Sequence, residues 1–175
     1  MTIEDITIII TSFRSKHKIN ICLNSIDKKV KVLVIENSKD KEFKESIEKQ
    51  YSNVECYLTG ENLGYAKANN IGLKKCTTKF SLVLNPDTIL EENTLKNLIH
   101  LANKYKDFYL IGPFNQQDKK IVNNSKYIEA QDAIEVENLK GFAIFFNMKK
   151  FNNGFFDENF RICHYCKFYL SHPLW

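Results

Sequence analysis

The residue types and spacings best suited to chemistry lie between Glu61 and Asp87. Asn85-Pro86-Asp87 follows the apolar run 80–84, and proline cannot continue the hydrogen-bond ladder of a strand. Magnesium binds one or two carboxylates together with substrate phosphates. Asp87 is therefore a candidate ligand for Mg²⁺ or Mn²⁺, with Asn85 as a neutral polar contact beside it. The alternative is a turn in which Asp87-Thr88 opens the next element.

The stretch 62–70 reads Asn-Leu-Gly-Tyr-Ala-Lys-Ala-Asn-Asn and is a second candidate. Gly64 permits close approach of a ligand to the backbone, and the start of the following helix offers free N–H groups to an anion. Asn69-Asn70 is an unusual pair inside a helix, where asparagine has low propensity. A diphosphate site fits this pattern, and ordinary solvated helix polarity is the alternative.

Polar residues also follow the first two apolar runs. Thr11-Ser12 comes after the first run, and Glu36-Asn37-Ser38 comes after the second. In open α/β sheets, acidic residues at this position accept hydrogen bonds from a ribose or a base. Taken singly, each group is also explained as a turn or helix cap.

The elements that must position these residues alternate between strands and helices. Continuous β-branched runs predict buried strands, and apolar residues at helical spacing predict helices that cover the sheet. This rhythm predicts an α/β fold with a mostly parallel sheet and right-handed crossovers. The expected strands are 6–10, 30–35, 54–58 (an edge strand), 80–84 and 141–146, and the expected helices are 19–26, 43–50, 65–75 and 95–102.

After Gly112-Pro113 the alternation stops. Residues 115–139 are polar, with a short strand-like piece at 120–122, before the apolar run 141–146. No linker rich in Gly, Pro or Ser separates this part. We therefore expect one domain over 1–175, with an atypical, loose tail at 161–175.

Composition excludes several classes of protein. The chain has 175 residues and a net charge of +4, and only Arg14 and Arg161 are arginines. Lysines interleaved with glutamates disfavour nucleic-acid binding, which uses arginine patches. No signal sequence and no apolar run of about 20 residues is visible. The five cysteines suit reduced thiols. We expect a cytoplasmic protein, with peripheral association at the inner face of a membrane as a further option.

Taken in order, these motifs resemble the family-2 glycosyltransferases of the GT-A fold, and in particular their rhamnosyltransferase-like branch. The resemblance covers about residues 6–160 and implies a three-layer α/β/α Rossmann-like architecture. Within the one domain it implies a nucleotide-sugar-binding half at 1–112 and an acceptor-side half at 113–160. The matching segments are Thr11-Ser12-Phe13, Glu36-Asn37-Ser38 (where the family usually has Asp first), Asn62 to Asn70, Asn85-Pro86-Asp87, Gly141 to Phe146 and Gly154 to Phe160.

The resemblance implies a hexosyltransferase-type enzyme that uses a UDP-, dTDP- or GDP-linked sugar with Mg²⁺ or Mn²⁺. The acceptor would be a polysaccharide or a lipid-linked precursor, whose hydroxyl attacks the anomeric carbon of the donor sugar with inversion. Asp87 would hold the metal and Glu36 would lie near the nucleoside. The substrate-binding residues expected in all are Thr11, Ser12, Phe13, Glu36, Asn37, Asn62, Gly64, Tyr65, Lys67, Asn70, Asn85 and Asp87.

The chain departs from the family pattern after Phe160. The family places an acidic cluster there that supplies the catalytic base, whereas residues 159–175 contain no Asp or Glu. The base is thus unassigned; Asp157 and Glu158 are the nearest carboxylates, although the resemblance gives them a mainly structural role. We expect a truncation or a change of reading frame near Phe160.

Three other readings stay open. The chain could be an impaired nucleotide-sugar-binding module or fragment that lacks the base. It could be an unrelated Rossmann-like nucleotide binder, although the first strand–helix turn lacks Gly-x-Gly-x-x-Gly. Cys163-x-x-Cys166 with His164 and His172 suggests zinc, but His164 lies inside the cysteine pair, against the usual spacing of structural sites. An accidental cysteine pair is the simpler reading, and His164 as a substitute base has pKa in its favour but no geometry.

Overall fold

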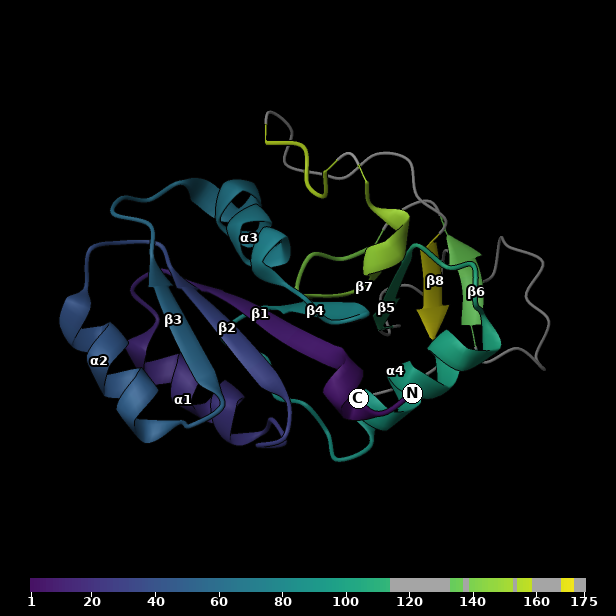
Figure 1. Ribbon diagram of the computed structural model, residues 1–175, viewed down its shortest axis with the longest axis horizontal. Coiled ribbons are helices and arrows are strands. Elements are labelled where there is room, and N and C mark those ends of the chain that lie inside the picture. Colours follow the sequence, from purple (N-terminus) through teal and green to yellow (C-terminus); the bar gives the residue numbers. More distant parts are fainter. Residues whose placement is uncertain (114–132, 137–138, 153, 159–167, 172–175) are drawn as a thin grey trace.

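One mixed sheet forms the centre of the computed structural model, which describes residues 1–113, 133–136, 139–152, 154–158 and 168–171 (Figure 1). The strands and helices are β1 (Ile6–Ser12), α1 (Lys16–Asn24), β2 (Lys31–Glu36), α2 (Lys41–Gln50), β3 (Val54–Leu58), α3 (Gly64–Lys75), β4 (Phe80–Leu84), α4 (Thr94–Lys104), β5 (Leu110–Pro113), β6 (Ala133–Val136), β7 (Ala143–Asn147) and β8 (Phe168–Ser171). The eight-stranded sheet has the order β3-β2-β1-β4-β7-β5-β8-β6.

The first half of the sheet is parallel. Strands β3, β2, β1 and β4 pair in parallel, with β3 at the edge. This confirms the strands expected at 6–10, 30–35, 54–58 and 80–84, and the edge position of 54–58. Parallel strands need crossover connections, and here α1, α2 and α3 supply them.

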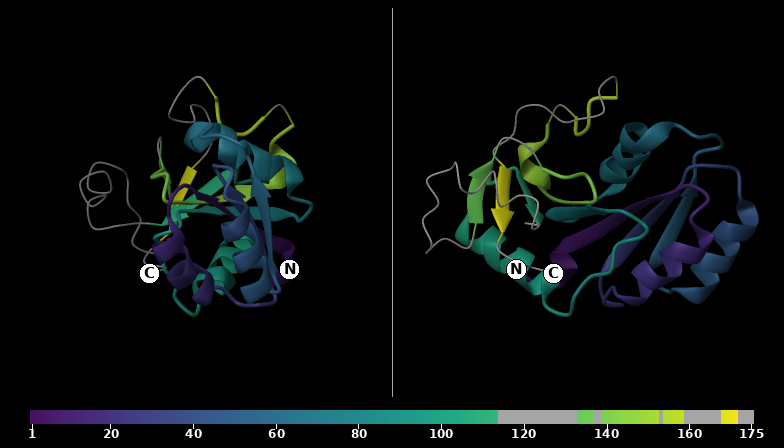
Figure 2. Two further views of the ribbon diagram at one scale, coloured as in Figure 1. Left: turned by 90° about the vertical axis from the view of Figure 1, so that its left-hand side faces the viewer. Right: turned by 180° about the vertical axis from the view of Figure 1, so that it is seen from behind.

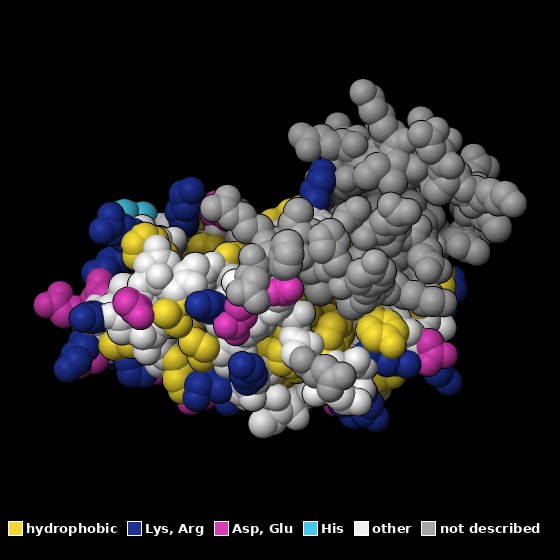
Figure 3. Space-filling view, turned by 90° about the horizontal axis from the view of Figure 1, so that it is seen from above, with side chains coloured by type: hydrophobic (Ala, Val, Ile, Leu, Met, Phe, Trp, Pro, Cys, Tyr) yellow, Lys and Arg dark blue, Asp and Glu magenta, His cyan; other side chains and the backbone are white. Residues whose placement is uncertain are grey.

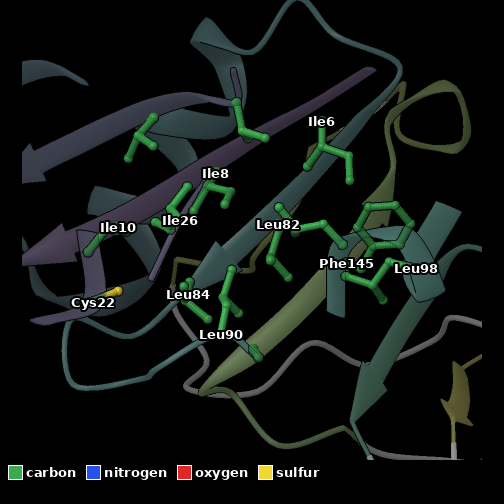
Figure 4. Close-up of a cluster of buried hydrophobic side chains, with 14 of the residues drawn as sticks. Ile6, Ile8, Ile10, Cys22, Ile26, Leu82, Leu84, Leu90, Leu98 and Phe145 are labelled. Carbon is green, nitrogen blue, oxygen red and sulfur yellow. The ribbon is translucent and has the colours of Figure 1, made fainter. Parts of the chain in front are cut away.

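The buried residues of the strands alternate between two cores. Ile8, Val34 and Leu82 face a large core that includes residues of α1, α2 and α4 (Figure 4). Ile9 and Leu33 face a smaller core on the other side, which includes residues of α3. Helices therefore cover both faces of the sheet (Figures 1 and 2), and the predicted three-layer α/β/α architecture is confirmed.

Helix α3 lies unusually close to the sheet at Gly72. A Cβ atom added there would lie 2.5 Å from Cγ2 of Ile9 and 3.3 Å from Cγ1 of Ile35. A side chain at this position would therefore overlap β1. Glycine lets the helix that carries the 62–70 motif pack directly on the central strands.

The second half of the sheet is where the sequence analysis and the structure differ. The strand expected at 141–146 is present as β7, but it runs antiparallel between β4 and β5. Strands β5 and β6 were not predicted. Strand β8 lies in the tail that we expected to be loose, and it pairs with both β5 and β6. That expectation was wrong for Phe168–Ser171, because backbone pairing orders a segment whose side chains match no motif.

Three buried aromatic rings join the two halves. Phe80 of β4 lies with its ring centroid 5.2 Å from that of Phe145 in β7 and 6.0 Å from that of Phe108. Phe108 and Phe145 stack at 5.7 Å. All three are at most 5% exposed, so the halves share one core. Within the described ranges, no helix is both long and apolar enough to cross a bilayer.

The strand-like piece expected at 120–122 and the group Cys163, His164, Cys166 and His172 lie outside the described residues.

Candidate functional site

The carboxyl ends of β1, β2 and β4 meet at one edge of the sheet. The strand register pairs Ser12 with Glu36 and Ile10 with Leu84. The N–H of Asn37 also donates to the carbonyl oxygen of Ser12 at 2.7 Å. The polar residues that follow these strands are thus neighbours, at the edge where open α/β sheets bind ligands.

The three residues that follow the apolar run of β1 differ in how open their side chains are to a ligand. The Thr11 hydroxyl donates to Oδ1 of Asn69 at 2.9 Å, and Ser12 is fully buried, its Oγ without a hydrogen-bond partner among the described residues. Phe13 is 40% exposed. The guanidinium of Arg14 lies 5.1 Å from the Phe13 ring centroid. Of these three side chains, that of Phe13 is therefore the most open to a ligand.

Asn37 ties the end of β2 to the loop before α3. Its amide nitrogen donates to Oδ1 of Asn62 at 2.9 Å. Its Oδ1 accepts from the Leu63 N–H at 2.9 Å and from the Thr59 hydroxyl at 3.2 Å. Asn37 is only 2% exposed. This side chain shapes the site by holding two loops together.

Glu36 is also enclosed. It is 4% exposed, and its Oε1 accepts a 2.6 Å hydrogen bond from the Ser38 hydroxyl. The Glu36 carboxylate is therefore buried in this conformation and is not open to a ligand. Its expected contact with a nucleoside stays a prediction.

Gly64 opens α3 with a φ of 80°, a left-handed conformation that favours glycine. A Cβ atom there would meet nothing within 4 Å, so backbone conformation rather than crowding explains the glycine. The side chain of Asn62 accepts from the Gly64 N–H at 3.0 Å. Asn62 thus occupies one of the N–H groups at the start of the helix.

The paired asparagines of α3 have distinct partners. Asn69 is completely buried; it donates to the Tyr65 carbonyl at 3.0 Å and accepts from Thr11. Asn70 accepts from the Phe156 N–H at 3.0 Å and donates to the Phe156 carbonyl at 2.8 Å. It also donates to Oε1 of Glu158 at 3.1 Å. The pair joins α3 to β1 on one side and to the 154–158 segment on the other.

The side chain of Tyr65 links α3 to Gly141, in the loop before β7. Its hydroxyl donates to the carbonyl of Gly141, and its ring meets Phe156 edge to face, with centroids 5.7 Å apart. Although 40% of the residue is exposed, burial around the hydroxyl raises the pKa of Tyr65 to about 12. Tyr65 therefore stays protonated and remains a donor at neutral pH.

Asp87 stands at the surface beyond the end of β4. Its carboxylate is 53% exposed and lies 3.5 Å from the Lys18 ammonium of α1. The chain beneath it is fixed, since the Asn85 N–H donates to the Phe142 carbonyl at 2.8 Å and the Cys22 thiol donates to the Asn85 carbonyl at 3.8 Å. Burial, and then the charge of Asp87, raises the pKa of the Cys22 thiol to about 12.

The donor set at Asp87 fits a divalent ion that is bound together with a substrate. No group of three or more His, Cys, Asp or Glu side chains that could hold an ion occurs among the described residues. A single exposed carboxylate is nonetheless what magnesium uses when phosphates and water complete its shell. The exposed ion pair with Lys18 is weak enough to be replaced.

A pocket of about 860 Å³ opens beside α3, between the end of β4 and the loop before β7. Of the expected site residues it brings together Gly64, Tyr65, Lys67, Asn85 and Glu158. The remaining expected residues do not line it: Thr11, Ser12, Phe13, Glu36, Asn37, Asn62, Asn70, Asp87 and Asp157.

Three residues that were not among the predicted site residues, Gly141, Phe142 and Phe156, line this pocket together with Leu63 and Ala66. The resemblance did mark the segments 141–146 and 154–160, which was the available signal. Positive and negative side chains are interspersed over the coloured part of the surface seen from above (Figure 3).

Comparisons with known proteins agree with this architecture. Among solved structures, S. aureus TarS 1–349 matches with a TM-score of 0.66 and 15% identity over 96% of this chain and 60% of that one. TarS 1–349 in complex with UDP-GlcNAc matches with a TM-score of 0.64 and 16% identity, over 96% of this chain and 58% of that one.

A mannosyltransferase from Pyrobaculum calidifontis, solved with GDP-Man and Mn²⁺, matches with a TM-score of 0.62 and 15% identity, over 82% of this chain and 44% of that one. These similarities show a shared fold, the GT-A fold that the sequence analysis predicted. The chain spans less than two thirds of each of these structures. A search of curated proteins gives no significant match.

The family described as glycosyl transferase family 2 matches residues 7–172, which is nearly the whole chain. Together with the GT-A fold, this match shows that the chain belongs to glycosyl transferase family 2.

Proposed function

We propose that this chain transfers a hexose from a nucleotide-diphosphate sugar to a polysaccharide or lipid-linked acceptor, with Mg²⁺ or Mn²⁺ and with inversion. The observation that carries the proposal is the position of the pocket. It opens at the carboxyl end of β4, where it is lined by Asn85, two residues before Asp87, and by the first turn of α3. Two solved structures of the same fold contain such donors: TarS 1–349 is in complex with UDP-GlcNAc, and the Pyrobaculum mannosyltransferase is in complex with GDP-Man and Mn²⁺.

The donor would lie along the edge formed by β1, β2 and β4. Phe13 offers an exposed ring for the nucleoside. Lys67 is an exposed cation on the pocket wall, suited to a diphosphate. Asp87 and the substrate phosphates would hold the metal, which when bound supplies charge stabilisation for the departing diphosphate.

An inverting displacement needs a carboxylate within hydrogen-bond reach of the attacking hydroxyl. Of the two nearest candidates, Glu158 lines the pocket and Asp157 does not. Glu158 is therefore the better candidate for the base among the described residues. Its carboxylate accepts a hydrogen bond from Asn70, which fixes its direction.

A second candidate function is a nucleotide-sugar-binding module without transfer activity. One observation favours it: residues 159–175 contain no Asp or Glu, although the family pattern places its acidic cluster there. In that case the chain binds a donor and needs a partner for catalysis.

Titration of UDP, dTDP and GDP with and without Mn²⁺ tests the proposal, followed by an assay of donor hydrolysis and transfer. Metal-dependent binding with turnover supports the transferase. Metal-dependent binding without turnover supports the binding module. If no nucleotide binds with Mn²⁺ present, both candidate functions are wrong.

Asp87→Asn tests the metal assignment. The substitution removes the negative charge that would hold the ion but keeps the shape of the side chain. We therefore expect Asp87→Asn to abolish the Mn²⁺-dependent part of nucleotide binding while the fold stays intact, so that affinity in Mn²⁺ falls to the affinity in EDTA. Asp107→Asn is the matched control, because Asp107 is also an exposed carboxylate paired with a lysine but lies outside the lining of the pocket. Equal Mn²⁺-dependent affinity in Asp87→Asn and the wild type would remove Asp87 from the site.

A further inference from the structure

Strand β3 forms one end of the sheet, since β2 is its one partner among the described strands. An edge strand presents N–H and C=O groups along its outer side, and these groups can pair with a strand from another molecule. The five residues of β3, Val-Glu-Cys-Tyr-Leu, include no proline and a single charged side chain, so the strand itself does little to prevent such pairing. Helix α2 lies beside it (Figure 1).

The hydrogen bonds at the two ends of β3 show which of its residues face outward. The Asn53 carbonyl and the Thr59 N–H both bond to the backbone of β2, at 2.9 and 3.1 Å. The backbone groups of successive residues in a strand point alternately to its two sides. Those of Val54, Cys56 and Leu58 therefore point outward, away from β2.

Two side chains of α2 occupy the backbone of Cys56, the central residue of this outer side. The Cys56 N–H donates to Oε1 of Glu48 at 2.7 Å, and the Cys56 carbonyl accepts from the ammonium of Lys44. Lys44 and Glu48 lie one helical turn apart and also pair with each other, Nζ to Oε1, at 2.6 Å. An ion pair thus takes the place that a neighbouring strand would have.

The contacts of α2 with the outer side extend to the start of the strand. The Val54 N–H donates at 3.1 Å to the carbonyl of Tyr51, the residue that ends α2. The side chains of Lys44 and Glu48 are only 35% and 32% exposed, so they lie against the strand. A strand added here would have to displace both and break the three hydrogen bonds that they make with Cys56 and with each other.

We propose that the Lys44–Glu48 pair closes β3 to strand addition, and that without it β3 pairs with β3 of a second copy of this chain. A second copy is the fitting partner because two identical edge strands match each other in an antiparallel pair about a two-fold axis. Centred on Cys56, this pair would join the outward groups of Val54 in one copy to those of Leu58 in the other. The inference goes beyond the proposed function and does not depend on nucleotide-sugar binding.

The double variant Lys44→Ala/Glu48→Ala tests the proposal on the whole chain. Alanine preserves the helix while it removes both contacts with Cys56. By light scattering, we expect a mass that rises with concentration to twice that of the wild type. Hydrogen exchange at the Cys56 amide should slow as the concentration of the variant rises, because the added strand covers this group, whereas exchange in the wild type should not depend on concentration.

Lys31→Ala/Glu55→Ala is the matched control. It removes another lysine–glutamate pair of β3, with a separation of 3.1 Å, but this pair joins β3 to β2 and leaves the contacts of α2 with Cys56 in place. The mass of this control should equal that of the wild type at every concentration. Association of the control to the same extent as the double variant would contradict the proposal.

A further substitution separates strand pairing from general aggregation. Leu58→Pro, added to the double variant, removes an outward N–H but no hydrogen bond to β2, so it should restore the mass of the wild type. Circular dichroism establishes that each variant is folded. If the double variant unfolds, Lys44→Ala alone decides, since it frees the Cys56 carbonyl and keeps the contact with Glu48. A folded variant that does not associate beyond the wild type, or association that Leu58→Pro leaves unchanged, would overturn the inference.

Discussion

The two halves of this molecule are built on different principles. In the parallel half, β1, β2 and β4 each end in polar residues at one edge, so motifs that are far apart in the sequence become neighbours in space. In the second half, β7 runs antiparallel to β4, and β5, β8 and β6 extend the sheet. The pocket residues of this half, Gly141, Phe142, Phe156 and Glu158, do not directly follow the end of a strand. The comparison teaches that strand order brings polar residues together in the parallel half. In the second half, hydrogen bonds from Tyr65 and Asn70 of α3 hold the pocket residues Gly141, Phe156 and Glu158 in place instead.

The largest expected effect is at Phe145, where the two halves share a core. The ring is fully buried between Phe80 and Phe108, and Phe→Ala in a core costs about 3–5 kcal/mol. We expect Phe145→Ala to lower the free energy of unfolding by that amount in a single transition. If amides of β2 kept their full hydrogen-exchange protection in this variant, the halves would be independent units and the shared core would be refuted.

A pair of glycine substitutions compares the packing of the halves. Gly72→Ala places its Cβ 2.5 Å from Ile9 Cγ2, a branched side chain fixed in β1, so we expect a loss of about 1–3 kcal/mol from overpacking. Gly112→Ala in β5 meets Leu139 Cδ2 at 2.8 Å, the movable end of a half-buried side chain. Denaturant unfolding should therefore show the smaller loss for Gly112→Ala. Equal losses would mean that the two halves are packed equally tightly.

The smallest expected effect is a pH dependence of the stability, which arises at Tyr65, where α3 is bound to the Gly141 carbonyl. Burial raises the pKa of Tyr65 from its ordinary 10.0 to about 12, so the folded state holds this proton more tightly than the unfolded chain. The resulting stabilisation is complete below about pH 10 and is lost between pH 10 and 12. Tyr65→Phe cannot titrate, and its stability should fall less steeply across that window. Thermal unfolding at several pH values measures the difference; identical slopes would show that Tyr65 titrates normally.

Much of the parallel half could be predicted because its strands are continuous apolar runs, such as Ile6–Ile10, whose two-sided burial leaves a clear pattern. Strand β5 could not, since its four residues include both Gly112 and Pro113. Strand β8 contains none of the sequence motifs, and it pairs with β5 and β6.

The candidate site, like the sheet, could be predicted only in part from the sequence. Asn70 stood out in the sequence because asparagine is a poor helix former, yet its partners are Phe156 and Glu158, more than 80 positions away. Spacing along the chain contains no information about hydrogen bonds between residues so far apart. The position of Asp87 after Pro86 was visible in the sequence, whereas its separation from the lining of the pocket emerged only from the fold.

Hydrogen exchange with UDP, dTDP and GDP in Mn²⁺ tests the central claim, that the carboxyl edge of the parallel half binds the nucleotide. The account predicts that at least one of them slows exchange in residues 11–13, 36–38 and 85–88, and that Asp87→Asn abolishes this Mn²⁺-dependent protection. If none of them slows exchange at these strand ends, or if protection appears only in the second half of the sheet, the account is contradicted.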